Sequence, residues 1–304
     1  MQYSTDGGAS WTVWEANSHV ALPAIGSKVY IRGNNPNGLS HAESKYTISD
    51  LAELDCTYFK MKGRIAASGS VMSLIDGEGN TTVIPSNRVG CFFFLFGRCN
   101  VLTKAPELPA TTLAERCYGS MFYDCGLTEI PKLPATTLAE FCYGNMFMSC
   151  SKLNKKPVLP ATTLATNCYL GMFSYTGLTE APDLPATKLE YRCYAYMFRE
   201  AKKLVKAPEL QATELASYCY EGMFMGCTSL KKAPELPATT LVNNCYSNMF
   251  NGCTSLIHIK VGTMTLDNNE DATKNWVAGI PGGGYFVFPC GSKYNKHGVS
   301  EVPD

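Results

Sequence analysis

Cysteine is the residue type most able to do chemistry in this sequence, which contains 14 of them. Most belong to one recurring phrase, Cys-Tyr-x-x-Met-Phe-x-x-Cys, which begins for example at Cys219 and again at Cys245. Zinc sites usually place two cysteines about two to four residues apart, whereas this phrase separates Cys219 from Cys227 by a longer interval. The four histidines are scattered along the chain. We therefore expect no metal site and no cofactor.

Disulfides are the second chemistry open to these cysteines. Residues eight apart on a helix are separated by about 12 Å, and a disulfide needs Cα atoms within about 7 Å of each other. Neighbouring repeats, if they were helices, would hold equivalent cysteines about 8 to 10 Å apart. Two copies of the phrase also replace the second cysteine, by Thr176 and by Ala201. The pattern favours reduced cysteines that fill a core as small apolar groups.

The phrase recurs at a nearly constant interval of 25 or 26 residues. It begins at Cys91, Cys117, Cys142, Cys168, Cys193, Cys219 and Cys245. A second phrase, Leu-x-x-Ala-Pro-x-Leu-Pro-Ala-Thr-Thr-Leu, lies between the copies. Self-similarity of this kind predicts a repeat protein, in which each unit buries its apolar face against its neighbours.

Each repeat is interpreted as one short strand followed by one helix. Apolar residues four apart, as in Leu241, Cys245, Met249 and Cys253, form one stripe of an amphipathic helix. The helix is expected to begin at a threonine followed three residues later by glutamate. Such pairs are Thr112 with Glu115, Thr137 with Glu140, and Thr187 with Glu190. The Leu-x-x-Ala-Pro segment predicts a strand that ends near its proline, which has no N–H for a sheet.

These units predict an α/β solenoid, a leucine-rich repeat stack, because a period of 25 or 26 residues falls within the range of leucine-rich repeats. Strands stack about 4.8 Å apart and helices about 8 to 10 Å apart, so the stack should curve with its strands inside. Three segments are expected. They are a small β-rich N-terminal domain at 1–73, the solenoid at 74–262, and a C-terminal cap at 263–304.

The phrase CYxxMFxxCxxLxxAPxLPATTL resembles the BspA-like leucine-rich repeats of surface proteins from gut and oral bacteria. The resemblance covers about 74–260 and rests on seven tandem copies. The chain departs from the common form in having Met-Phe in place of Ala-Phe, and in its added Cys-Tyr. The resemblance implies a secreted or surface-displayed protein that binds or adheres. Similar arrays also resemble parts of phage tail proteins.

The remaining features narrow the functional classes. Lysine plus arginine equals aspartate plus glutamate, at 26 each, which argues against nucleic acid as a partner. No run approaches about 18 apolar residues, so no membrane span is predicted. The start, MQYSTDGGASW, lacks an export signal. We expect an extracellular or cell-surface location, with the signal or anchor not present in this chain. The oligomeric state cannot be inferred.

No nucleophile with a base, phosphate-binding loop or carboxylate cluster was found, so no catalytic residues are predicted and a non-enzymatic binding module is favoured. The first alternative is a phage tail-type component that recognises a receptor. The second is an enzyme with its site in residues 1–73.

One charged stripe is the candidate ligand-binding site for a protein or a glycan. It consists of the residue two positions after each repeat leucine: Lys104, Glu129, Lys155, Glu180, Lys206, Lys232 and His258. Opposite charges on neighbouring repeats would alternatively form exposed ion pairs worth about 0 to 1 kcal/mol each. The rows of Tyr, Met and Phe are expected in the core.

Overall fold

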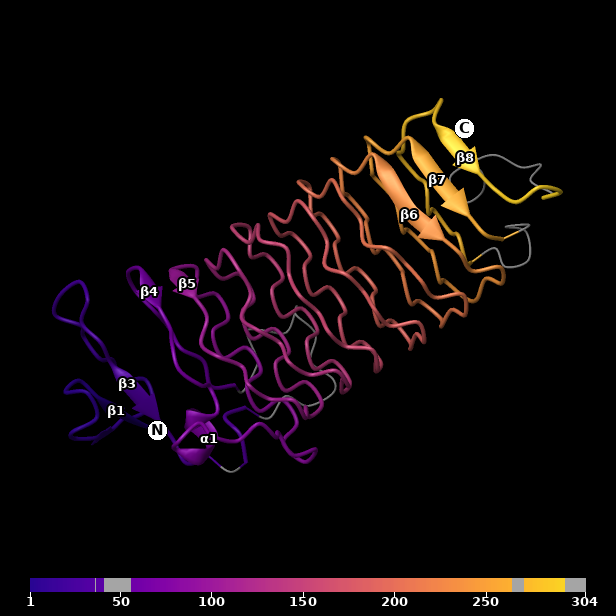
Figure 1. Ribbon diagram of the computed structural model, residues 1–304. Helices are drawn as coiled ribbons and strands as arrows, with labels where there is room; N and C mark the ends of the chain where they lie inside the picture. Colours follow the sequence, from indigo (N-terminus) through magenta and orange to yellow (C-terminus); the bar gives the residue numbers. More distant parts are fainter. Residues whose placement is uncertain (36, 41–55, 264–270, 293–304) are drawn as a thin grey trace.

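The structure is a computed structural model that describes residues 1–35, 37–40, 56–263 and 271–292. The chain forms a long stack of coils, one for each repeat (Figure 1). Its regular elements are short: β1 (Gln2–Ser4), β2 (Thr12–Val13), β3 (Tyr30–Arg32), β4 (Ile65–Ala66), α1 (Ser73–Asp76), β5 (Leu102–Lys104), β6 (Lys232–Leu236), β7 (His258–Val261) and β8 (Tyr285–Val287).

Aromatic side chains of successive repeats stack in two rows through the core. Tyr118 lies over Tyr143 with ring centroids 6.0 Å apart, and Phe122 lies over Phe147 at 5.5 Å. The two rows continue in the same manner along the stack. They comprise Phe92, Tyr118, Tyr143, Tyr169, Tyr194, Tyr220 and Tyr246 in one row, and Phe96, Phe122, Phe147, Phe173, Phe198, Phe224 and Phe250 in the other. These aromatic residues are buried, as expected from the sequence.

The segment around each Cys-Tyr-x-x-Met-Phe phrase, here called the turn segment, does not form an α-helix. Alternate N–H groups, such as those of Tyr118 and Phe122, donate to carbonyls of the next repeat, those of Cys142 and Met146. The N–H groups between them donate three residues back within the same repeat, as from Met121 to the carbonyl of Tyr118. Half of the backbone bonds therefore join neighbouring repeats.

The prediction of one helix per repeat is therefore wrong, and with it the strand-plus-helix solenoid and the leucine-rich repeat class. A helix has about 3.6 residues per turn, so its stripe would drift by about 40° every four residues, whereas this pattern repeats strictly every fourth residue. Every fourth residue adopts a left-handed conformation instead. In one repeat these are Arg116, Ser120 and Asp124, with φ of 55°, 51° and 53°.

The predicted capping boxes are also wrong. Thr112 pairs with Val83 of the preceding coil in an isolated parallel bridge, and Glu115 forms an ion pair with Arg116 at 3.2 Å. Neither residue begins a helix.

The strands of the Leu-x-x-Ala-Pro segments are shorter than expected. Parallel pairs join β4 to β5 and β6 to β7 to β8, while the described repeats between β5 and β6 contribute only isolated bridges. The proline of each repeat removes an N–H donor from the sheet. The register of β6 shifts against β7 between Lys232 and Glu235, on either side of Pro234. By contrast, β7 contains no proline, and it pairs with β8 over three residues without a shift.

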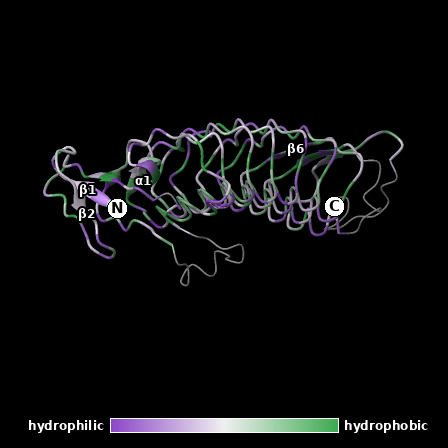
Figure 2. Cartoon of the chain, turned by 90° about the horizontal axis from the view of Figure 1, so that it is seen from below, coloured by the Kyte–Doolittle hydropathy of each residue, from purple (hydrophilic) through white to green (hydrophobic). Residues whose placement is uncertain are grey.

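The predicted curvature is also absent from the described stack, which runs almost straight (Figure 1). Curvature was expected because helices would need a wider spacing than strands. Both aromatic rows instead keep centroid distances between 5.5 and 6.1 Å, as for Phe122 with Phe147 and Tyr220 with Tyr246. Successive coils follow one another as an even row when viewed from below (Figure 2).

The two ends of the core are covered by different segments. Near the N-terminus, β1 pairs antiparallel with β2 and β3. Trp14 stacks on Phe59 at 5.8 Å, and Phe59 packs on Phe96 at 5.4 Å. At the other end Trp276 lies against Tyr246 and Phe250 at 6.5 and 6.2 Å.

The coil that carries Trp276 is a further copy of the turn segment, although it has no cysteine. The N–H of Phe250 donates to the carbonyl of Trp276, as each repeat donates to the next, and Asn275 and Gly279 occupy left-handed positions four apart. From the sequence, this coil was expected to belong to the cap at 263–304. The division into the three segments 1–73, 74–262 and 263–304 stays a prediction.

Candidate binding surface along the stack

The charged stripe predicted from the sequence lies on successive coils. Five of its members are exposed, and Glu180 and His258 are half-buried. Glu180 and Lys206 pair as backbone neighbours, as do Lys232 and His258. The structure thus brings the residues of adjacent repeats side by side at these two places.

The centre of the stripe is an ion-pair network around Glu180. Its carboxylate accepts from Lys206 at 2.7 Å and lies 3.0 Å from the ammonium of Lys156. Lys156 also donates to Asp183 at 3.1 Å. The hydrogen bond from Lys206, followed by that from Lys156, lowers the pKa of the Glu180 carboxyl. The repeat register predicted Lys155 opposite Glu180, but the neighbouring Lys156 makes the contact.

Outside this centre, fewer residues of the stripe form ion pairs. Among the described residues, Lys104, Glu129, Lys155 and Lys232 form no ion pair or side-chain hydrogen bond. Towards the C-terminal end, Glu235 pairs with Lys260 at 2.9 Å, and the hydrogen bond from Lys260 lowers the pKa of Glu235. The unpaired lysines are therefore the cations of the stripe that are available to an external ligand.

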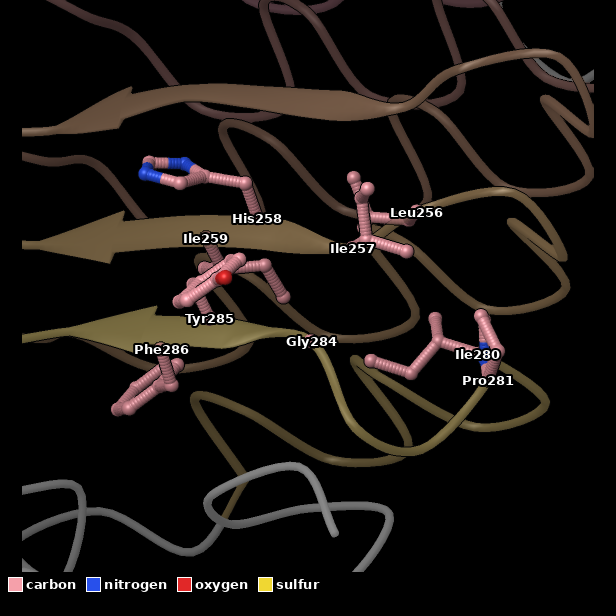
Figure 3. Close-up of a pocket in the computed structure, with 9 residues that line it drawn as sticks. All are labelled: Leu256, Ile257, His258, Ile259, Ile280, Pro281, Gly284, Tyr285 and Phe286. Atoms are coloured by element: carbon pink, nitrogen blue, oxygen red, sulfur yellow. The ribbon is translucent and has the colours of Figure 1, made fainter.

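His258 ends the stripe beside a small hollow between β7 and β8. His258 and Tyr285 project from these two strands on the same side of the sheet, while Ile257, Ile280 and Pro281 lie at the other end of the hollow (Figure 3). The hollow has a volume of about 30 Å³, which suits about one water molecule and no larger ligand. It therefore does not form a binding pocket.

The cysteines are thiols whose bonding explains their position in the core. All 14 are free, and 12 of them are buried. The Sγ of Cys150 donates to the carbonyl of Phe122 in the preceding repeat at 3.0 Å, and Cys253 donates to Phe224 at 3.0 Å. Ala201 has no thiol to donate to Phe173, and the Thr176 hydroxyl donates to that carbonyl instead at 2.8 Å. The second cysteine is thus both a core filler and a link between coils.

The predicted helical spacing does not separate the cysteines, because the stacked rings of neighbouring coils lie only 5.5 to 6.1 Å apart. Equivalent side chains in register point in parallel, however, and a disulfide needs Cβ atoms about 3.5 to 4.5 Å apart. Burial also raises the pKa of Cys150 to about 12 and that of Cys253 to about 12, which suppresses the reactive thiolate.

We expect thiol titration of the denatured, unreduced protein to detect nearly all of its 14 cysteines. The same titration of the folded protein should detect mainly Cys56 and Cys290, which are the two cysteines that are not buried. If most thiols of the denatured protein were blocked, the cysteines would be cross-linked rather than buried thiols.

The described residues contain no group of three or more His, Cys, Asp or Glu side chains that could hold a metal ion. In the same part of the chain, no helix combines the length and the apolar character needed to cross a membrane. No model of a protein family, no curated protein and no solved structure matches the chain.

Sequence reasoning missed a second surface on the turn segments. It comprises tyrosine and arginine side chains for which no role was predicted. They include Tyr175, Tyr196 and Arg199, in which the guanidinium lies 5.9 and 5.8 Å from the two ring centroids. One sequence signal could have indicated this surface: a bulky residue stands where other repeats carry Gly or Asn, as Tyr196 does in place of Gly222 and Asn248.

Proposed function

We propose that this protein is a non-enzymatic binding or adhesion module of the cell surface that recognises a protein or a glycan through the side of the stack. The observation that carries the proposal is the regular row of charged residues on a scaffold whose interior is filled by stacked apolar side chains. The resemblance of the repeat phrase to those of bacterial surface proteins supports the location, although the strand-plus-helix architecture expected from it is wrong.

The scaffold is well suited to extended recognition. Each coil is joined to the next by backbone hydrogen bonds and by two stacked rings, so side chains on adjacent coils hold fixed separations. A ligand that contacts several coils therefore loses little affinity to ordering of the protein. Lys155 and Lys232, which form no ion pair among the described residues, would supply attraction for anionic groups.

The proposal predicts that reversing charge in the stripe abolishes binding while the fold is kept. The labelled wild-type protein is applied to glycan and protein arrays, and its hits are compared with those of a Lys155→Glu, Lys232→Glu double variant. Both lysines are exposed, so the melting temperature should change little. The retained array signals should also fall with added salt, because exposed charges are screened over about 8 to 10 Å.

A matched control carries the same change of net charge elsewhere. Lys152 and Lys203 are exposed and lie in the links between the turn segments and the stripe, and the Lys152→Glu, Lys203→Glu variant should keep the wild-type hits. Retention of every hit by the stripe variant would remove the stripe as the binding site.

A further inference from the structure

Six side chains of three successive repeats form a continuous row on the turn segments, here called the tyrosine–arginine row. They are Tyr175, Arg199, Tyr196, Glu221, Arg192 and Tyr218. Each contacts the next: Arg199 lies over the rings of Tyr175 and Tyr196, Tyr196 donates to Glu221 at 2.6 Å, Glu221 pairs with Arg192 at 2.9 Å, and Arg192 lies 5.6 Å from the centroid of Tyr218. The row is therefore one connected surface.

The backbone beneath the row is unfavourable for such large side chains. Tyr175, Arg192, Tyr196 and Tyr218 have φ of 59°, 52°, 55° and 60°. Bulky residues rarely adopt this left-handed conformation, in which Gly and Asn are the most tolerated. The same left-handed positions recur along the stack, as at Arg116 and Phe141, so the row carries its large side chains at positions that the coil sets. The stack itself does not require them, since the position of Tyr196 is Gly222 in the next repeat.

The next repeat makes room for the row. A Cβ at Gly222 would collide with the ring of Tyr196, so glycine at this position lets that ring lie across the neighbouring coil. The ring is then fixed at its far end by the bond from its hydroxyl to Glu221. Tyr196 is thus held in one orientation before any partner arrives, which reduces the ordering cost of binding.

The charges of the row leave one cation unmatched. Glu221 accepts from both Arg192 and Tyr196, and Glu200 pairs with Lys202 at 3.3 Å. Within the described residues, the Arg199 side chain has no hydrogen bond or ion pair, and its buried Nε lacks a partner. Its guanidinium is instead held between two tyrosine rings. A guanidinium binds a carboxylate through two parallel hydrogen bonds, so this site has the chemistry to accept one.

We propose that the tyrosine–arginine row binds an acidic segment of a partner protein, with a carboxylate on Arg199 and apolar side chains against the tyrosines. Tyrosine and arginine are enriched in the energetic centres of protein interfaces. Tyr175 is 39% exposed, and Tyr191, whose ring packs against Tyr218 at 5.5 Å, is 43% exposed, which leaves ring surface for such contacts. The inference deepens the proposed function, because it rests on the stack being a binding module and names a partner class.

The test uses the full chain and a fluorescein-labelled decapeptide of alternating Glu and Trp, measured by fluorescence anisotropy at low salt. The wild-type protein should bind this peptide and not the matching peptide of alternating Lys and Trp. Arg199→Gln should weaken binding by about tenfold or more, because the charge and the paired hydrogen bonds are both lost. Arg199→Lys should recover only part of the affinity, since it restores the charge without the planar fork. The exposed Lys203→Gln is the matched control and should bind as the wild type does.

Three results would overturn the inference. They are no binding of the Glu peptide by the wild type, equal binding by Arg199→Gln, or equally tight binding of an oligogalacturonate, which carries its carboxylates on sugars. Melting curves of each variant separate loss of fold from loss of binding. The two proposals can fail separately. If the Lys155→Glu, Lys232→Glu variant lost its array hits while Arg199→Gln left peptide binding unchanged, the row would be excluded as a binding site and the proposed function would be supported.

Discussion

Replacing Phe224 by alanine should lower the free energy of unfolding by about 3 to 5 kcal/mol, the usual cost of removing a buried phenylalanine. Phe224 is fully buried and stacks between Phe198 and Phe250 with centroids 5.7 and 5.8 Å away. The substitution opens a cavity that interrupts one aromatic row, and the coils above and below cannot close it without losing their shared spacing. Denaturant unfolding followed by circular dichroism measures the change.

Lys203→Ala is the control for this substitution, because Lys203 is exposed and lies outside both aromatic rows. Its effect should remain below about 0.5 kcal/mol. Similar unfolding midpoints for the two variants would mean that the Phe row does not hold the coils together.

Replacing Gly177 by alanine should destabilise the protein by about 1 to 3 kcal/mol through overpacking. An added Cβ would lie 2.5 Å from the carbonyl oxygen of Ser151 and 3.1 Å from that of Leu153, both in the backbone of the preceding coil. The backbone cannot turn aside as a flexible side chain could. Gly177 also explains one feature of the repeat length, because it is the single residue between Thr176 and Leu178, where longer copies have two residues.

The longer link of a later repeat provides the control. Ser229 lies between Cys227 and Leu230 and is half-buried, so Ser229→Ala should change the unfolding free energy by less than about 0.5 kcal/mol. If Gly177→Ala unfolded at the same denaturant concentration as Ser229→Ala, the close approach of the two coils would be contradicted.

The sequence allowed the repeat boundaries and the core residues to be predicted, because stacked coils must place equivalent side chains at equal intervals. Tyr118 and Phe122 lie in the core for this reason. The helix prediction failed because a period of four resembles the helical period of about 3.6 over a short window. Two signals favoured the observed turns. The first is the strict four-residue repeat itself. The second is Asn or Gly at positions four residues apart, as in Asn244 and Asn248, which both adopt the left-handed conformation.

The candidate site could be predicted only in part. The position of the charged stripe follows from repeat register, so Glu180 and Lys206 were expected to be neighbours. The choice of Lys156 over Lys155 depends on which side chain projects beside Glu180, and one sequence does not determine this within an irregular segment. The tyrosine–arginine row was missed because its contacts run between repeats, as from Arg199 to Tyr175, and depend on the coil geometry that replaces the predicted helix.

The hydrogen bonds between turn segments have a mechanical consequence. They run along the axis of the stack, from each coil to the next, so a force that separates the two ends acts on them directly. The outermost coil would detach first, and each detached repeat of 25 or 26 residues would release on the order of 90 Å of extended chain. A partner bound to the middle of the stack would stay attached while the end coils unwind one after another.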